Sequence, residues 1–212
     1  MARSFNELLQ LSAKTHGHMC PGQVLGVRMA MLGLALLGCE APLNETDIKK
    51  IVIFVEIDRC AADALTAVTG VKLGRRSLKF KDFGLMAATF VHLPDDRAVR
   101  VAVREDCRDR AAELLPHVID PVQREIEAYQ AMRAEDIFTV ESVRVELRPE
   151  ELPGYRGEKA LCDVCGAMIR NRREVVSHGR TLCPVCAGLA YFERLGPVEG
   201  LDALDPSRPG RV

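Results

Sequence analysis

The stretch IVIFVEIDRCAADALTAVTG, residues 51–70, decides the fold class of this chain. Its first five residues are apolar without interruption and rich in β-branched side chains, which is typical of a strand buried on both faces. A helix is predicted over residues 61–69, and Gly70 fits its C-terminal stop. A buried strand that leads into a helix indicates a domain in which helices cover a sheet.

Two helices are predicted before this strand. Ser4 and Glu7 form a capping-box pattern, so the first helix is expected over residues 5–14. Pro21 fits the first position of a second helix, which continues to about residue 37.

Small residues recur on one face of this second helix, at Gly26, Ala30 and Gly33. They would let another backbone approach closely. The partner is either another element of the same chain or a second copy of the chain.

Further elements follow the central stretch. Strands are expected at residues 78–80, 85–93, 99–103 and 138–147, and helices at 106–115 and 121–133. The chain is therefore predicted to be an α+β protein with a mixed sheet. Its domains are expected to be a core over 1–147, a Pro- and Gly-rich linker over 148–158, a small zinc-binding domain over 159–196 and a flexible tail over 197–212.

Composition narrows the class of protein. The 212 residues include 29 basic and 30 acidic ones, so the net charge is -1 and we expect weak binding to nucleic acid, or none. The N-terminus lacks the apolar segment of a signal peptide, and the apolar run at residues 24–39 is too short to span a bilayer. Eight cysteines without a secretion signal favour a reducing compartment, so we expect a cytoplasmic protein without a membrane anchor.

The strongest chemical signal is a pair of C-x-x-C motifs, Cys162/Cys165 and Cys183/Cys186. Each motif directs two thiolates at one point, and together they supply the tetrahedral sulfur shell that zinc prefers. Gly166 suits the tight turn of a zinc knuckle. We predict one structural zinc, whose binding contributes on the order of 10 kcal/mol to folding so small a domain.

The zinc-binding segment CDVCGAMI…GRTLCPVCA resembles the short zinc finger of DksA/TraR-type proteins. A hairpin is expected over 174–182 between the two motifs. Arg170, Arg172 and Arg173 are interpreted as a solvated face, with contact to phosphates as the alternative. His178 is expected in an exposed turn, because four sulfurs already complete the zinc site.

A second chemical signal is HGHMCPG, residues 16–22. In an extended loop, alternate side chains point the same way, so His16, His18 and Cys20 can converge. Cys20 precedes the helix that begins at Pro21, where free N–H groups favour a thiolate. Such a group is either a transition-metal site or an activated nucleophile. The competing interpretation is a helix cap with incidental histidines.

Cys60 offers a partner for this loop, because it follows the buried strand and opens the next helix. Asp58 or Asp63 is suited to orient a histidine from behind. If metal is bound, we expect Cys20 with His18 and one of His16 or Cys60, and an open position for substrate or water.

The motifs HGHMCPG, EIDRCAADALTAVTGVKLG and LKFKDFGLMAATF, in this order, resemble the family of E-type subunits of formylmethanofuran dehydrogenase over roughly residues 10–135. The resemblance implies an α+β core that dimerises, and the appended zinc finger recurs in that family. It implies His16, His18, Cys20, Cys60 and Asp63 as catalytic candidates around one pocket. One departure is visible: family members often read TxGKGNL where this chain has KLGRRSL, residues 72–78, so only Arg75 retains the basic group.

The leading hypothesis is a zinc protein of this family, with a metal or thiol site in its core whose second metal is unidentified. The resemblance implies that it is accessory to, or derived from, a molybdenum- or tungsten-dependent one-carbon oxidoreductase, whose subunits are its candidate partners. It also implies a homodimer. The alternative is a zinc-finger regulator or assembly factor whose core binds a small molecule or metal.

Overall fold

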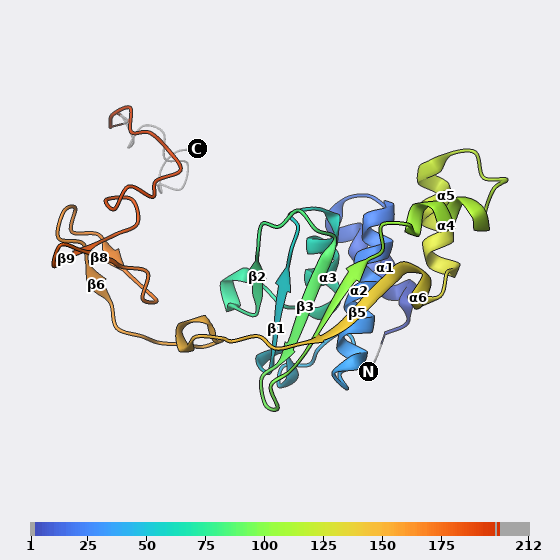
Figure 1. Cartoon of the computed structure of the whole chain (residues 1–212), viewed down its shortest axis with the longest axis horizontal. Coiled ribbons are helices and arrows are strands. Elements are labelled where there is room, and N and C mark those ends of the chain that lie inside the picture. Colours follow the sequence, from blue (N-terminus) through green and yellow to red (C-terminus); the bar gives the residue numbers. More distant parts are fainter. Residues whose placement is uncertain (1–2, 198, 200–212) are drawn as a thin grey trace, which may run out of the picture. The chain divides into compact units, whose positions relative to one another are not determined.

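The computed structural model describes residues 3–197 and 199, which fall in two compact units, Met1–Tyr155 and Arg156–Val212. Figure 1 follows the chain through both units. The tail predicted over 197–212 lies almost wholly outside the described residues.

The first unit contains a five-stranded sheet in the order β2-β1-β3-β4-β5. The central strand β1 (Ile51–Val55) pairs parallel with β2 (Leu78–Phe80) and antiparallel with β3 (Ala87–His92). β3 pairs antiparallel with β4 (Arg97–Val103), which pairs antiparallel with the edge strand β5 (Phe138–Val143). The predicted α+β class and mixed sheet are confirmed.

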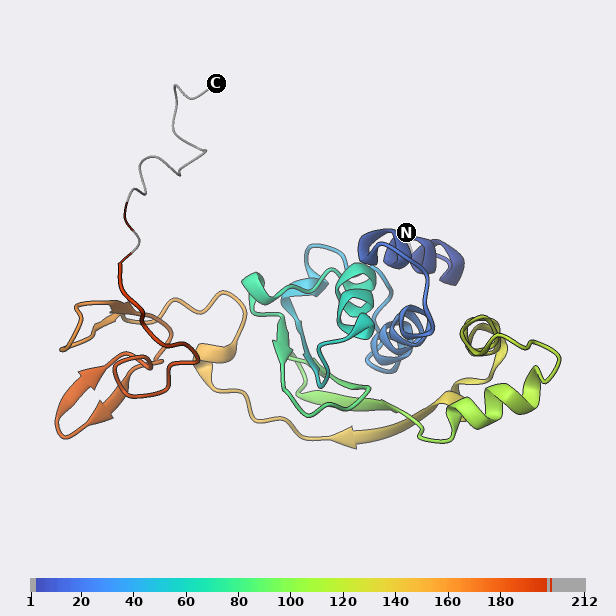
Figure 2. The ribbon, with the colours of Figure 1, turned by 90° about the horizontal axis from the view of Figure 1, so that it is seen from above.

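Three helices cover one face of this sheet, α1 (Phe5–His16), α2 (Pro21–Leu36) and α3 (Cys60–Thr69) (Figure 2). Alternate residues of β1 explain the packing: Ile51, Ile53 and Val55 join the buried cluster with the helices, whereas Val52 belongs to a smaller cluster with Val91 and Ala98. The other helices of the unit follow β4: α4 (Cys107–Leu114), α5 (Pro121–Ala131) and α6 (Ala134–Ile137). Short 3₁₀ turns lie at Asp47–Lys49, Leu73–Arg75 and Pro149–Glu151.

The small-residue face of α2 packs inside the chain. A Cβ atom added to Gly26 would lie 2.6 Å from the Cβ of Ala64 on α3, and one added to Gly33 would lie 2.3 Å from the ring of Phe90 on β3. Ala30 is fully buried. Of the two alternatives for this face, the structure shows packing within one chain, so the face gives no support to a dimer.

The first helix extends two residues further than predicted. It ends at His16, and Gly17, with a φ of 100°, provides the left-handed residue that stops it. His16 is therefore the last residue of a helix and not part of an extended loop. The capping box at its start is present, since the Ser4 hydroxyl accepts from the Glu7 amide and the Glu7 carboxylate accepts from the Ser4 amide.

The second unit is built from short strands around the C-x-x-C motifs. β6 (Ala160–Leu161) pairs with β7 (Met168–Ile169), and β8 (Val175–Ser177) forms a hairpin with β9 (Arg180–Leu182). His178 and Gly179, both with positive φ, form the hairpin turn. Within the described residues of both units, no helix is long and apolar enough to cross a membrane.

Candidate metal centres

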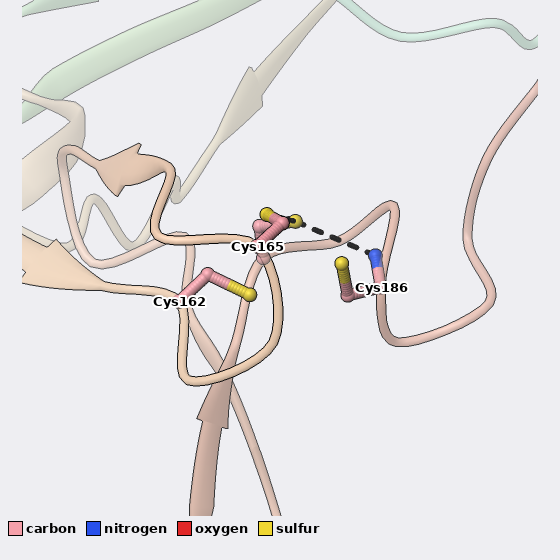
Figure 3. Close-up of side chains that lie close together, drawn as sticks. Cys162, Cys165 and Cys186 are labelled. Carbon is pink, nitrogen blue, oxygen red and sulfur yellow. Dashed lines mark hydrogen bonds between the residues drawn. The ribbon is translucent and has the colours of Figure 1, made fainter.

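The four cysteines of the second unit form one candidate centre. The sulfur atoms of Cys162, Cys165, Cys183 and Cys186 all lie within 4.8 Å of one another, and those of Cys165 and Cys183 are 3.8 Å apart. A tetrahedral site with zinc–sulfur bonds of about 2.3 Å places its sulfurs about 3.8 Å apart. Figure 3 shows three of these side chains gathered between the two loops. Their number, type and spacing fit one tetrahedral metal ion.

Backbone amides prepare this centre for thiolates. Hydrogen bonds from the backbone at Cys183 and Cys165 lower the pKa of Cys162 to about 6. Hydrogen bonds with the Cys165 and Cys183 thiols raise the pKa of Cys186 to about 12, because further negative charge accumulates there. Four thiolates at this spacing need a cation, which is what a structural metal supplies.

The arginines of the hairpin region and His178 lie outside this group. Arg170, Arg172 and Arg173 are exposed, as the interpretation of a solvated face requires. His178 is exposed, and its Nδ1 lies 3.1 Å from the Ser177 hydroxyl oxygen.

The core contains a second candidate centre, formed by His16, Cys20 and Cys60. One potential ligand atom of each residue lies within 4.8 Å of the others, and all three are half-buried. His16 ends α1, Cys20 is the N-cap of α2, and Cys60 is the first residue of α3. The centre thus joins the ends of three helices that are packed against one another.

Asp63 fixes the orientation of the histidine. Its Oδ2 lies 2.8 Å from the Nδ1 of His16, and the His16 side chain is only 15% exposed. Because Nδ1 is held by the carboxylate, Nε2 is the ring nitrogen left for a metal. A carboxylate behind a histidine in this way sets its tautomer and strengthens it as a ligand.

Gly22 allows the two thiols to approach. A Cβ atom there would lie 2.9 Å from the Cβ of Cys60 and 3.8 Å from the sulfur of Cys20. Burial and the hydrogen bond with Cys20 raise the pKa of Cys60. Two neighbouring thiols therefore resist losing both protons unless a cation is present.

A buried polar chain behind the centre was not predicted. The Ser12 hydroxyl donates to the Gln23 side-chain oxygen, and the Gln23 amide donates to the Cys60 carbonyl at 2.7 Å. Ser12 and Gln23 are both fully buried, so these bonds tie α1, α2 and the start of α3 together. A single polar residue inside the apolar helix PGQVLGV is the sequence signal that could have found Gln23.

The remaining candidates lie outside the core centre. His18 is exposed and stacks near His16, with 4.7 Å between ring centroids, but it does not belong to the three-residue group. Asp58 and Arg75 are exposed. Cys39 and Cys107 also lie outside both groups, and burial raises the pKa of each.

Comparison with known families decides the relationship. Residues 15–152 match the family model described as "FmdE, Molybdenum formylmethanofuran dehydrogenase operon". The chain belongs to the FmdE family. The match contains the whole core centre and ends before the cysteines of the second unit, so the likeness of that unit to DksA/TraR fingers stays a prediction.

Two relatives extend this comparison. A protein of Archaeoglobus fulgidus described as a probable S-adenosyl-L-methionine-binding protein is 33% identical over 205 residues, which cover 87% of this chain. The chain spans about half the length of that relative, 53%. An FmdE-like protein from Syntrophus aciditrophicus, described as belonging with a tungsten formylmethanofuran dehydrogenase, shares the fold, with a TM-score of 0.59 and 21% identity over 91% of this chain and 100% of that one.

Proposed function

We propose that this FmdE-family chain is a two-metal protein with a working site in its core and a structural zinc in its second unit. The observation that supports the core site best is the set of His16, Cys20 and Cys60 with Asp63 behind the histidine. Nitrogen and sulfur donors at this spacing suit zinc or a similar divalent transition metal.

Three protein ligands leave one position of a tetrahedral centre open. Catalytic zinc sites keep such a position, whereas structural sites close it with a fourth protein ligand. When bound, a metal there supplies Lewis-acid chemistry to a substrate oxygen or to water. Asp63 holds the His16 ring in place, and Gln23 fixes the helix end that carries Cys60.

We further propose that the protein is cytoplasmic and acts as an accessory to a molybdenum- or tungsten-dependent one-carbon oxidoreductase, the system for which the family is named. Its partners would then be the subunits of that enzyme and a second copy of this chain. The zinc of the second unit would be structural, because its four sulfurs leave no open position.

Cobalt substitution tests the core site. Refolding the chain with Co²⁺ should give thiolate-to-cobalt absorption from both centres. Cys20→Ser and Cys60→Ser should each remove the core contribution and leave that of the second unit, and Cys162→Ser should do the reverse. Cys39→Ser, outside both groups, should leave the spectrum unchanged. If Cys20→Ser has the spectrum of the unsubstituted chain, no metal is bound in the core.

A second candidate function is suggested by the name of the Archaeoglobus relative. The core would then bind a small molecule, S-adenosyl-L-methionine, and the protein would regulate or assemble a partner. Calorimetric titration with S-adenosyl-L-methionine tests this directly, with Cys20→Ser as the variant that separates ligand binding from metal binding. Absence of heat at millimolar ligand would remove this candidate.

A further inference from the structure

A cavity of about 460 Å³ lies beside the core centre, at the edge of the sheet where β4 ends and β3 begins. Its walls come from the first turns of α2, from the loop before β3, and from α4 and α5. This volume is within the range of about 300–1,000 Å³ that is usual for small-molecule sites. The metal ligands themselves do not line this cavity.

The cavity adjoins the thiols through a single residue. Gly22 lines it, and a Cβ on Gly22 would lie 3.5 Å from the sulfur of Cys60 and 3.8 Å from that of Cys20. A molecule that rests against this glycine is therefore close to the open side of the core centre.

Part of the lining is apolar, with Leu25 and Val103, but it also contains a buried polar pair. The sulfur of Cys107 lies 3.5 Å from the hydroxyl oxygen of Tyr129, and these residues are 4% and 1% exposed. Burial raises the pKa of both groups, so both stay protonated. When the thiol donates to the tyrosine oxygen, the tyrosine proton is free for an acceptor in the cavity.

Three arginines line the same cavity, and two of them are engaged at short distance. Arg100 makes two bonds to the buried Glu56, at 2.8 and 2.7 Å, and Arg104 is bonded to Asp106 at 2.9 Å. Arg108 contacts Glu125 only at 3.5 Å, and its side chain is 77% exposed. Arg108 is thus the guanidinium with donors available to a ligand.

We infer that this cavity binds a small organic carboxylate, with its carboxylate on Arg108, its apolar body against Leu25 and Val103, and an acceptor atom on the Tyr129 hydroxyl. The inference extends the proposed function, because it makes the carboxylate the substrate class of the adjoining core centre. Arg108 and Tyr129 determine specificity in this arrangement.

The binding test uses 2-naphthoate as the probe and 2-naphthamide as an uncharged probe of nearly the same shape, with the full-length zinc-loaded protein. Naphthoate should bind about tenfold more tightly than naphthamide, the usual effect of a charge-assisted hydrogen bond. Arg108→Gln should remove most of this difference. Tyr129→Phe should weaken naphthoate binding while its ring still fills the core.

Arg133→Gln is the matched control, because Arg133 is 76% exposed, also has one acidic partner, Glu135, and does not line the cavity. It should leave naphthoate binding unchanged. Equal affinity for the two probes, no detectable binding of either, or an Arg108→Gln variant that binds naphthoate like the original chain would each overturn the inference.

The position of the probe is tested separately from the existence of the metal site. In protein loaded with Co²⁺, the protons of bound naphthoate should relax faster than in the zinc form, and Cys20→Ser should abolish this effect. If Cys20→Ser loses core metal but naphthoate binds the cobalt protein without enhanced relaxation, the metal proposal survives and the shared site fails. If naphthoate binds as predicted while the core takes up no metal, the carboxylate site survives and the metal proposal fails.

Discussion

The Nδ1 atom of His16 lies 2.8 Å from the Oδ2 atom of Asp63, so a carboxylate of α3 orients a histidine at the end of α1. The two residues are 47 positions apart in the sequence, and the packing of α1 on α3 brings them together. This pair turns the His16 ring so that its other nitrogen is available beside two thiols.

Asp63→Asn should weaken the core metal without removing it. Loss of a carboxylate behind a metal-bound histidine typically lowers affinity about 10- to 100-fold. Competition with a chromophoric chelator measures the change, and Asp58→Asn, an exposed carboxylate outside the group, serves as the control. Equal metal affinities of the two variants would show that Asp63 has no part in the site.

Gly26→Ala should destabilise the chain, although alanine is the better helix former. The new Cβ would lie 2.6 Å from the Cβ of Ala64 and 2.9 Å from the Cα of Ala61, so α2 and α3 must move apart. We expect a loss of about 1–3 kcal/mol in the free energy of unfolding, measured with urea. Gly74→Ala, where no atom lies within 4 Å, should cause no comparable loss. A Gly26→Ala protein as stable as the original would contradict this packing.

Acid should remove the stabilisation that Asp106 provides. Hydrogen bonds from Arg104 and Arg110 lower the pKa of Asp106 to about 2, whereas an unfolded aspartate has a pKa of about 3.9. The folded chain therefore binds this proton less readily, and the contribution is present above about pH 4 and is lost as the pH falls toward 2. The difference in unfolding free energy between Asp106→Asn and the original chain should shrink over this window. A difference that stays constant from pH 5 to pH 2 would show that the ion pairs do not stabilise the fold.

Cysteine labelling should separate the site thiols from the buried ones. Without metal, Cys20 should alkylate faster than Cys107, because Cys107 is 4% exposed and burial raises its pKa. With metal, Cys20 should be protected. Mass spectrometry of all eight cysteines, with and without chelator, gives the rates. Equal rates for Cys20 and Cys107 in both conditions would argue against a special role for Cys20.

Local patterns in the sequence predicted most of the elements. The strand over residues 51–55 and the capping box at Ser4 and Glu7 appear as expected, because each depends on neighbouring residues only. The C-x-x-C pairs were equally informative, since two short turns determine where four sulfurs point. The exact end of α1 was missed by two residues, although Gly17 carries the stop signal.

What the sequence left open depends on packing between distant elements. The small residues of α2 were compatible with a dimer seam, and only the position of α3 and of Phe90 shows that the chain fills this face itself. The choice between His16 and His18 was open for the same reason, because it depends on which histidine meets Cys60 and Asp63 across the fold. The strand order of the sheet is likewise a long-range property.

The most direct test of the core metal site is the metal content of the full-length chain purified without chelator. Elemental analysis should give two zinc or similar divalent ions per chain, and one in Cys20→Ser, with the remaining ion lost in Cys162→Ser combined with Cys20→Ser. One ion per chain in the original protein, undiminished in Cys20→Ser, would contradict the claim that His16, Cys20 and Cys60 form a metal site.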